Sequence, residues 1–422
     1  MASPHYRWLV VALTVLNQAI SVGILIYSFA LFVVPWLDEF EVSRGQLMIA
    51  IFLLQMTVGF ASPVLGRWLD TYSIRVLVVA GGVATGLGLF ALSQATAFWQ
   101  IVVIHMTLLP LGMVLCGTLA SQTIVSKWFT ENRGVAIGVS AAGTSLGGFV
   151  FPLITAALIA QFGWQTTLIV LSLSAFLLLV PANLWILRIP PPAPRSVRAG
   201  DEDHIDARVW ADREILSTRM FWIPVAALMP MNAAFGGVQF NLGAYVSDLG
   251  FEQAFAAQLI AITSLGMIGG KFLFGWLGDR VDHRRLYWGM AVSLALAMGL
   301  YLGAPDAAEL RFAALLQGIA TGGVMPMMGI VYSSRFGTLA FGKVLGYVNL
   351  FLMMGSFGSI LSGWLFDVTG SYDYAFLTFL ALVLPCAVAM YWLPSPAQNA
   401  ESAAAPADSI EAAGAAGARD AE

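Results

Sequence analysis

A single lysine stands inside a long apolar and glycine-rich stretch of the chain. Lys271 lies in the segment SLGMIGGKFLFGWLGDR, which runs from Ser264 to Arg280. On helical spacing, Met267 and Gln253 share its face with Ser264 and form a mildly polar stripe. An ionisable residue within a membrane-spanning segment usually faces a cavity and marks a binding site or a pathway. Lys271 is therefore the first candidate for a ligand site.

The chemistry of that site depends on what balances the positive charge. We find no aspartate or glutamate in the interior of any predicted helix, so the lysine has no internal counterion. Acidic residues stand instead near the outer ends of the helices, namely Asp248, Glu252, Asp367 and Asp373. A buried charge without a partner is costly, and an organic anion arriving from water would supply the missing charge. The alternative is that the lysine stem extends to the membrane surface, about two helical turns away.

Composition predicts that the elements positioning this lysine lie in a membrane. Of the 422 residues, 59% are hydrophobic and 10% are charged, whereas about 25% of a soluble domain is charged. A bilayer core needs roughly 20 apolar residues per helix, and blocks of that length without strict alternation indicate helices. We therefore predict an all-α membrane protein with twelve spanning helices. The predicted blocks are 8–34, 46–66, 76–95, 99–122, 134–159, 165–187, 221–246, 253–277, 286–303, 308–332, 343–366 and 373–393.

The basic residues predict how these helices are oriented. The first apolar block is too long for the core of a signal peptide, so we expect it to be the first span. With the N-terminus in the cytoplasm, one side keeps only Arg44 and Arg311, as expected when positive charge stays inside. Both termini are then cytoplasmic, in a multi-pass protein of the cell inner (plasma) membrane. The cytoplasmic turns hold Arg67, Arg75, Lys127, Arg133, Arg188, Arg195, Arg198, Arg208, Arg213, Arg219, Arg280, Arg284, Arg285, Arg335 and Lys343.

The polar segments divide the chain into four parts. Residues 1–187 form a first six-helix half and residues 221–395 a second one. Between them, residues 188–220 form a cytoplasmic linker that opens with prolines, and its part from about 203 to 216 is suited to a short amphipathic surface helix. The alanine-rich residues 396–422 are expected to be a disordered cytoplasmic tail.

Other classes of function lack the residues that they need. No nucleotide-binding loop, metal cluster or pair of nucleophile and base stands out, and the loops are too short for a catalytic domain. We therefore predict that the protein is not an enzyme and has no cofactor or metal. Nucleic acid is excluded as a partner because no basic patch is present. Cys116 and Cys386 lie inside predicted helices and imply no disulfide.

A short motif occurs once in each half. GRWLD ends the second predicted helix at Asp70 and is followed by Arg75, and GWLGDR ends the eighth with Asp279 and Arg280. Repetition of this kind is typical of transporters built from two related halves. With twelve helices and a central loop, the chain resembles the major facilitator superfamily, although Thr71, Ser73 and Asp282 depart from the family's loop motif.

The resemblance implies roles for this motif and for the arginine after the fourth helix. In the superfamily these turns latch one conformation and do not touch substrate. We therefore assign conformational gating to Asp70, Arg75, Arg133, Asp279 and Arg280. It also implies that a single chain is the functional unit.

A second signature narrows the resemblance to one branch. The segment KWFTENRGVAIGVSAAGTSLGG, Lys127 to Gly148, is similar to a pattern of the monocarboxylate transporters and the oxalate:formate antiporters. The matching positions are Trp128, Phe129, Arg133, Ala136, Gly138, Ala142, Gly143 and Gly147. The spacing of Gly134, Gly138, Gly143 and Gly147 independently predicts close helix packing.

The same branch gives Lys271 a role. Its members carry an arginine eight residues before the loop aspartate, where this chain has Lys271, and that cation binds the substrate carboxylate. Lysine lacks the planar fork of arginine. Ile260 stands where related carriers have an acid, which leaves proton coupling by that acid unsupported. Leu352 stands where the oxalate branch has a second cation, so one cation favours a monoanion over a dianion.

Further polar residues inside helices are candidates for the same cavity. They are Tyr27, His105, Thr118, Asn232, Tyr245 and Asn349. Each one taken alone is more typical of packing or of a hydrogen bond between helices, and His105 is the one that could carry a proton near neutral pH.

The function predicted from these observations is secondary transport of small organic anions by alternating access, with monocarboxylates as the favoured class. Symport with protons, antiport and facilitation all remain open as modes. The alternative within transport is a facilitator-type exporter of hydrophobic or drug-like compounds, which usually needs a carboxylate in the membrane. A membrane enzyme and a sensor that does not transport are the remaining alternatives.

Overall fold

The computed structural model describes residues 4–129, 133–187, 210–278 and 280–394 of the chain. Within these ranges the protein consists of helices and short connections, and no strand occurs among them. The prediction of an all-α protein is therefore confirmed.

The helices of the N-terminal bundle begin close to the predicted blocks. One of them, α8, contains Gly163 with a φ of 73°, so it is two helices that meet at a turn which glycine adopts without strain. The bundle contains α1 (Pro4–Val22), the π-helical turn η1 (Gly23–Tyr27), α2 (Phe29–Phe40), α3 (Arg44–Thr71), α4 (Ile74–Ser93), α5 (Phe98–Met106), α6 (Leu108–Cys116), α7 (Thr118–Trp128) and α8 (Arg133–Ile186).

The C-terminal bundle follows the same plan. It contains α9 (Asp212–Ser217), α10 (Arg219–Asp248), α11 (Gln253–Gly278), α12 (His283–Leu300), α13 (Ala307–Gly322), α14 (Val324–Met353), η2 (Met354–Ser356), α15 (Phe357–Thr369), α16 (Asp373–Ala389) and η3 (Met390–Trp392).

These helices account for the twelve predicted crossings. Ten helical stretches of the described chain are long and apolar enough to span a membrane, and one of them, Val135–Ile186, is divided at Gly163. The remaining crossing is α12, whose 18 residues fit the short ninth block.

The predicted linker is described only at its end. Residues 188–209 and the tail 396–422 lie outside the described residues. The short helix α9 covers the last part of the expected surface helix, and α10 begins at Arg219, two residues before the predicted boundary. Lys343 pairs with Asp212 and donates to the carbonyl oxygen of Trp210. The hydrogen bond from Lys343 lowers the pKa of the Asp212 carboxyl.

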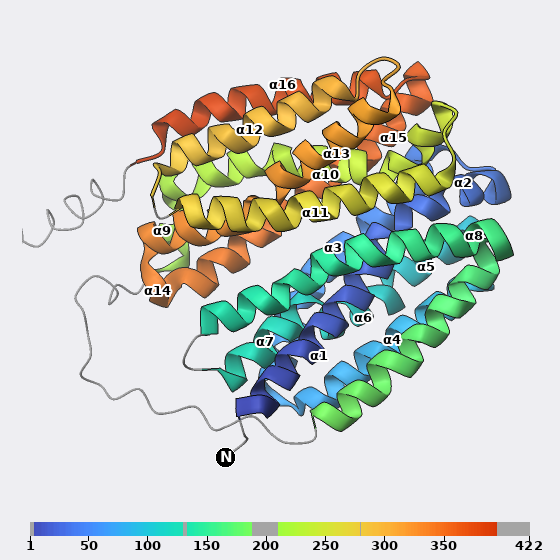
Figure 1. Ribbon diagram of the computed structural model, residues 1–422. Helices are drawn as coiled ribbons and strands as arrows, with labels where there is room; N and C mark the ends of the chain where they lie inside the picture. The colour runs from blue at the N-terminus through green and yellow to red at the C-terminus, as the bar shows by residue number, and fades with distance from the viewer. Residues whose placement is uncertain (1–3, 130–132, 188–209, 279, 395–422) are drawn as a thin grey trace, which may run out of the picture.

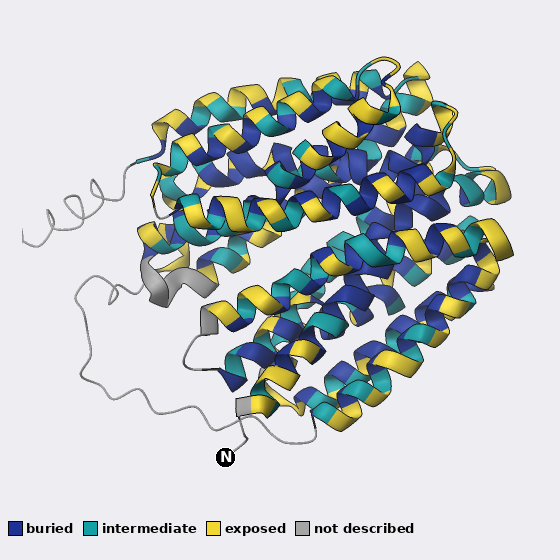
Figure 2. Cartoon of the chain, viewed as in Figure 1, coloured by how far each residue is buried: buried dark blue, intermediate teal, exposed yellow. Residues whose placement is uncertain are grey.

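The two bundles lie side by side, with most of their long helices running in the same general direction (Figure 1). Helices α8 and α11 are adjacent where the bundles meet. Buried residues concentrate inside each bundle and between the two, whereas the outward faces mix exposed and intermediate residues (Figure 2). Large apolar side chains on those faces, such as Phe60, Trp185 and Phe272, are suited to contact with lipid.

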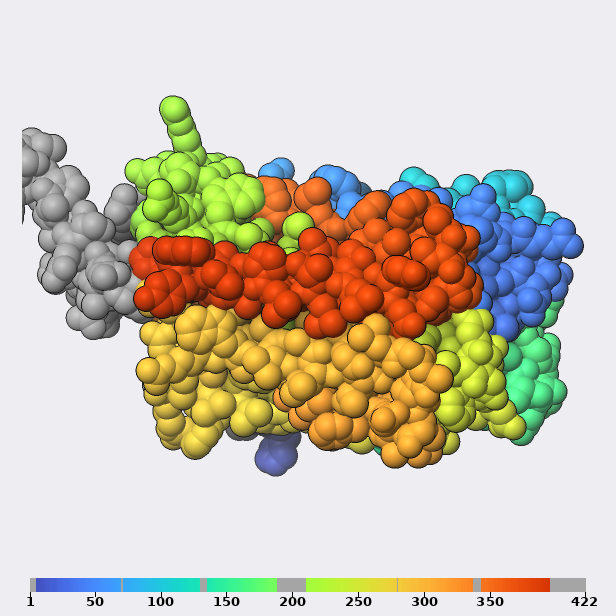
Figure 3. Space-filling model, turned by 90° about the horizontal axis from the view of Figure 1, so that it is seen from above, coloured from blue at the N-terminus to red at the C-terminus, as the bar shows by residue number. Residues whose placement is uncertain are grey.

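The outer surface of the C-terminal bundle is formed by helices far apart in sequence. Figure 3 shows α16 as a continuous ridge that runs along this face. Below we call the end of the molecule where α3 begins and α10 ends the Arg44 end, and the end where α11 ends and α12 begins the Asp282 end.

Close helix contacts confirm part of the glycine prediction. A Cβ atom on Gly143 would lie 2.5 Å from the carbonyl oxygen of Val15, and one on Gly147 would lie 2.2 Å from that of Ala19. Only glycine therefore allows α8 to lie this close to α1. Gly138 has no heavy atom within 4 Å of that position, so its predicted role in packing is wrong.

Candidate functional site

Lys271 reaches from the C-terminal bundle to the N-terminal bundle. Its Nζ atom donates hydrogen bonds to Ser145 Oγ at 2.9 Å, Thr144 Oγ1 at 3.2 Å and the carbonyl oxygen of Ala141 at 3.3 Å. All three acceptors belong to α8. The ammonium group is thus held between the bundles by neutral oxygen atoms.

The described residues provide no counterion for this lysine. Ion pairs in the described chain involve Arg44 with Asp248 and Lys343 with Asp212, and Lys271 takes part in none. Its side chain is half-buried, with Ser145 fully buried beside it. The expectation of an internal lysine without an acidic partner therefore holds for the part of the chain that the structure describes.

A second group of polar atoms lies next to the lysine along α11. Ser264 is fully buried, and its hydroxyl has no hydrogen-bond partner among the described residues. The phenol of Tyr27 donates to the sulfur of Met267 at 3.1 Å, which is a weak acceptor. A Cβ atom on Gly148 would lie 2.3 Å from Ser264 Oγ and 2.9 Å from the Tyr27 ring, so glycine at this position lets three helical segments converge.

The position of Tyr27 depends on an irregular turn. In η1 the amide and the hydroxyl of Ser28 both donate to the carbonyl oxygen of Gly23 at 3.0 Å, and the hydroxyl of Thr155 donates to Ser28 Oγ at 3.1 Å. A single π-helical turn inside an α-helix often occurs at a functional site. Here it ends at Tyr27 and sets the direction of that side chain.

These residues form one group, which we call the central cluster: Tyr27, Thr144, Ser145, Ser264, Met267 and Lys271. Hydrogen-bond donors outnumber strong acceptors in it, and its net charge is positive. Such a group is complementary to an anion with oxygen acceptors. Sequence reasoning missed Thr144 and Ser145, although both stand in the GTSLGG part of the second signature.

The other predicted cavity residues lie elsewhere. Asn232 donates to the carbonyl oxygen of Leu352 at 2.8 Å, and Tyr245 donates to that of Tyr301 at 2.6 Å. These bonds hold helices of the C-terminal bundle together. Their assignment to substrate binding stays a prediction.

His105 and the two exposed candidates have no hydrogen bond or ring contact with the central cluster among the described residues. Thr118, the first residue of α7, and Asn349 in α14 are both exposed. His105 is buried, its Nδ1 atom lies 2.8 Å from the carbonyl oxygen of Ile101, and its ring contacts Phe29 and Trp36. Of the predicted binding residues, the structure brings together only Tyr27 and Lys271.

A second cation joins the bundles at the Arg44 end. The guanidinium of Arg44 makes two contacts with the carboxylate of Asp248, donates to the Tyr372 hydroxyl at 3.0 Å and lies 3.7 Å from the centre of the Phe366 ring. Asp367 accepts hydrogen bonds from the amides of Arg44 and Gly45 at 3.0 and 2.8 Å, which stabilises the beginning of α3. We call these residues the Arg44 cluster.

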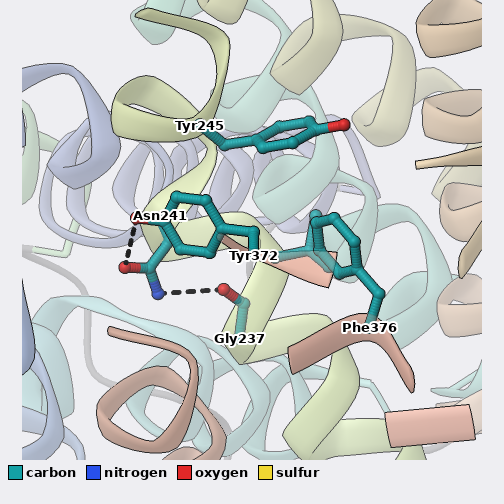
Figure 4. Close-up of a pocket in the computed structure, with 6 residues that line it drawn as sticks. Gly237, Asn241, Tyr245, Tyr372 and Phe376 are labelled. Carbon is teal, nitrogen blue, oxygen red and sulfur yellow. Dashed lines mark hydrogen bonds between the residues drawn. The ribbon is translucent and has the colours of Figure 1, made fainter. Parts of the chain in front are cut away.

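The Arg44 cluster continues into the C-terminal bundle through Tyr372. Figure 4 shows Asn241, Tyr245, Tyr372 and Phe376 around a narrow pocket. The Tyr372 hydroxyl donates to Asn241 Oδ1 at 3.3 Å, and Asn241 Nδ2 donates to the carbonyl oxygen of Gly237 at 2.9 Å. Arg44 is therefore connected to the interior of α10 by a chain of hydrogen bonds.

The residues predicted to act in gating are only partly described. Asp279 and the side chains of Asp70 and Arg133 lie outside the described residues. Arg75 is half-buried, with no partner for its Nε atom in the described chain. Arg280 donates to the carbonyl oxygen of Trp276 at 3.3 Å and lies over its ring.

Comparison with known proteins agrees with this architecture. Residues 12–310 and 259–416 match the sequence pattern of the Major Facilitator Superfamily. The chain belongs to this superfamily. It is therefore a multi-pass membrane transporter and not an enzyme.

Individual relatives are similar at low identity. Monocarboxylate transporter 13 of Rattus norvegicus is 26% identical over 394 residues, which are 92% of this chain and 89% of the relative. The uncharacterized MFS-type transporter YcxA of Bacillus subtilis (strain 168) is 25% identical over 384 residues, 88% of this chain and 91% of the relative. The agnestins efflux protein AgnL12 of Paecilomyces divaricatus is 25% identical over 301 residues, 71% of this chain and 66% of the relative.

A solved structure has the same superfamily fold. The bacterial homologue of the human lysosomal transporter Spinster, in its inward-facing and unoccupied conformation, superimposes with a TM-score of 0.74 at 14% identity, covering 93% of this chain and 98% of that one. At this identity the likeness concerns the fold alone.

Proposed function

We propose that this transporter carries small organic anions, monocarboxylates above all, and that Lys271 binds their carboxylate group. One observation carries the proposal: the ammonium group lies between the two bundles and is surrounded by neutral oxygen atoms of α8. The similarity to a monocarboxylate transporter over most of the chain supports the same class of substrate.

The electrostatics of the site favour a monoanion. Hydroxyl and carbonyl dipoles offset only part of the cost of taking an ammonium group out of water. A carboxylate would add a full opposite charge at hydrogen-bond distance, which is the stronger kind of hydrogen bond. Lys271 is the only cation in the central cluster, so a dianion would leave one charge unbalanced.

The contacts between the bundles support alternating access. At the Arg44 end, α3 packs against α15 so closely that a Cβ atom on Gly363 would lie 2.9 Å from the carbonyl carbon of Arg44. We propose that this end is the extracellular side and is closed here, and that the termini lie in the cytoplasm of a plasma-membrane protein. Substrate would then reach Lys271 from the Asp282 end.

The same residues bear on the mode of coupling. Ile260 stands where related transporters have an acidic residue, so another group would have to carry the proton. His105 lies among aromatic rings with one nitrogen bound to the backbone, which suits a structural role. We favour exchange or facilitation, and uptake driven by an inward proton gradient alone would instead establish symport.

A second function is export of hydrophobic compounds. It is supported by the similarity to an efflux protein over 301 residues. The two functions differ in the role of Lys271, because a neutral hydrophobic substrate gains nothing from the ammonium group.

The test is uptake of labelled lactate and pyruvate by purified protein in liposomes. Lys271→Ala should lower the rate at low substrate concentration by about 30-fold or more, since losing one partner of a buried charge pair costs at least 2 kcal/mol. Lys271→Arg should retain part of the wild-type uptake rate. Lys343→Ala is the matched control, because Lys343 pairs with Asp212 away from the central cluster. Normal uptake by Lys271→Ala would falsify the proposal.

A further inference from the structure

Two hydroxyl groups accept hydrogen bonds from Lys271, but they differ in whether their own hydrogen is donated to another group. Thr144 Oγ1 accepts from Lys271 and donates its own hydrogen to the carbonyl oxygen of Ala141 at 2.9 Å. Ser145 Oγ accepts from Lys271, and none of the described residues accepts a hydrogen bond from it. One buried donor next to the ammonium group is therefore unused.

The local helix does not satisfy this donor. A serine inside a helix commonly donates to the carbonyl oxygen four residues earlier, which for Ser145 is the oxygen of Ala141. That oxygen already accepts from Lys271 and from Thr144. Ser145 itself is fully buried, so bulk water does not replace the missing acceptor.

We propose that Ser145 is a direct ligand of the substrate carboxylate and supplies a second donor beside the lysine, which has no planar fork of its own. A hydroxyl can accept one hydrogen bond and donate another at the same time. Ser145 can thus keep its bond from Lys271 while donating to one carboxylate oxygen. Lys271 has three donors, all in use, so it donates to the other oxygen in place of its longest bond, the one to the carbonyl oxygen of Ala141. This inference rests on the proposed function and specifies how the anion is recognised.

The pair also joins the two bundles through the substrate. Ser145 belongs to α8 and Lys271 to α11, so a carboxylate held by both is bound by both halves at once. A ligand shifts a conformational equilibrium only when it binds the states unequally. A substrate bridging these helices binds most tightly in the states in which they are adjacent.

The experiment measures lactate affinity of the full-length protein in detergent by calorimetry. Ser145→Ala should weaken binding about tenfold, the size expected for one hydrogen bond to a charged group. Ser145→Thr, which keeps a hydroxyl group, should keep most of the wild-type affinity. Thr144→Val should have a smaller effect than Ser145→Ala. Ser174→Ala is the control, because Ser174 lies in the second helix of α8, beyond the turn at Gly163, and donates to the carbonyl oxygen of Leu171.

The alternative role for Ser145 predicts no loss of lactate affinity in Ser145→Ala, or a gain. If it only solvates the empty lysine, its removal frees the ammonium group, and lactate binds Ser145→Ala equally well or more tightly; this result would overturn the inference. Should Ser145→Ala not be recovered, Ser145→Cys serves the same purpose, since a thiol is a weak donor. Reduced affinity then supports the inference and unchanged affinity contradicts it.

Failure of this inference can be told apart from failure of the proposed function. When Lys271→Ala abolishes lactate binding and Ser145→Ala does not weaken it, only the role of Ser145 is wrong. When neither variant changes binding, the carboxylate site itself is wrong. A double variant adds a third readout: in Lys271→Arg, whose guanidinium has a fork of its own, Ser145→Ala should cost less affinity than it does with lysine.

Discussion

In the part of the chain that the structure describes, two cations cross between the bundles of this transporter, and their surroundings differ. Arg44 reaches from the N-terminal bundle to Asp248, Phe366 and Tyr372 of the other bundle. Lys271 reaches in the opposite direction and finds two hydroxyls and a carbonyl. The protein thus satisfies one of these charges with acids of its own and leaves the other to neutral dipoles.

The difference assigns the two contacts to different tasks. A bidentate arginine–carboxylate pair is specific in geometry and needs no ligand, so the Arg44 cluster can hold one end of the carrier closed when the site is empty. An ammonium group surrounded by neutral oxygens gains most when an anion arrives. We propose that the same kind of interaction, a cation between two bundles, serves as a lock at one place and as a binding site at the other.

The largest effect is expected when Lys271 is given an acidic partner, as Arg44 has. Ser145→Asp would place a carboxylate beside Nζ, as Asp248 stands beside Arg44. We expect lactate transport in liposomes to fall to background although the lysine is kept, because the new ion pair competes with substrate. Ser145→Asn, which is similar in size but neutral, should retain measurable transport. Equal activity of the two variants would contradict the comparison.

A smaller effect is expected when Arg44 loses its acidic partner. Asp248→Asn keeps the shape but lowers the charge, and we expect the Arg44 end to open more often. Cysteines placed at buried positions of α3 and α15 near that end, such as Leu47 and Ser362, should then be labelled faster from that side, and the transport rate should change severalfold. Reversing the pair, Arg44→Asp with Asp248→Arg, should restore part of the wild-type labelling. No recovery in the reversed pair would argue against a direct lock.

The smallest effect is expected at Tyr372. Tyr372→Phe removes only the hydroxyl that links Arg44 to Asn241, while the ring keeps its packing in the pocket of Figure 4. Losing one such hydrogen bond costs about 1 kcal/mol. The labelling assay should therefore show a shift in the same direction as Asp248→Asn but smaller. A larger shift than that of Asp248→Asn would mean that the phenol, and not the ion pair, holds this end closed.

Much of the fold and one part of the site could be predicted from sequence. Apolar length alone yields the twelve crossings, including the short α12, because a bilayer fixes the length of a spanning helix. The lysine was recognisable as a candidate because charge is rare in such helices. The positions of Gly143 and Gly147 in the signature also predicted where α8 packs closely.

The missing parts depend on contacts between segments distant in the chain. Periodicity identifies the polar face of a helix but not the helix opposite it, so nothing in the sequence placed Ser145 next to Lys271 or Asp248 next to Arg44. The π-helical turn before Ser28 has no sequence signal that we could identify.

The most direct test of the account compares binding of lactate and of lactamide, its neutral amide, to the wild-type protein and to Lys271→Met by calorimetry. Methionine keeps the length of the side chain and removes its charge. We predict that lactate binds the wild type, and that neither lactamide with the wild type nor lactate with Lys271→Met gives measurable heat. Lactate binding to Lys271→Met with wild-type affinity would contradict the claim that the unpaired ammonium group is the anion site.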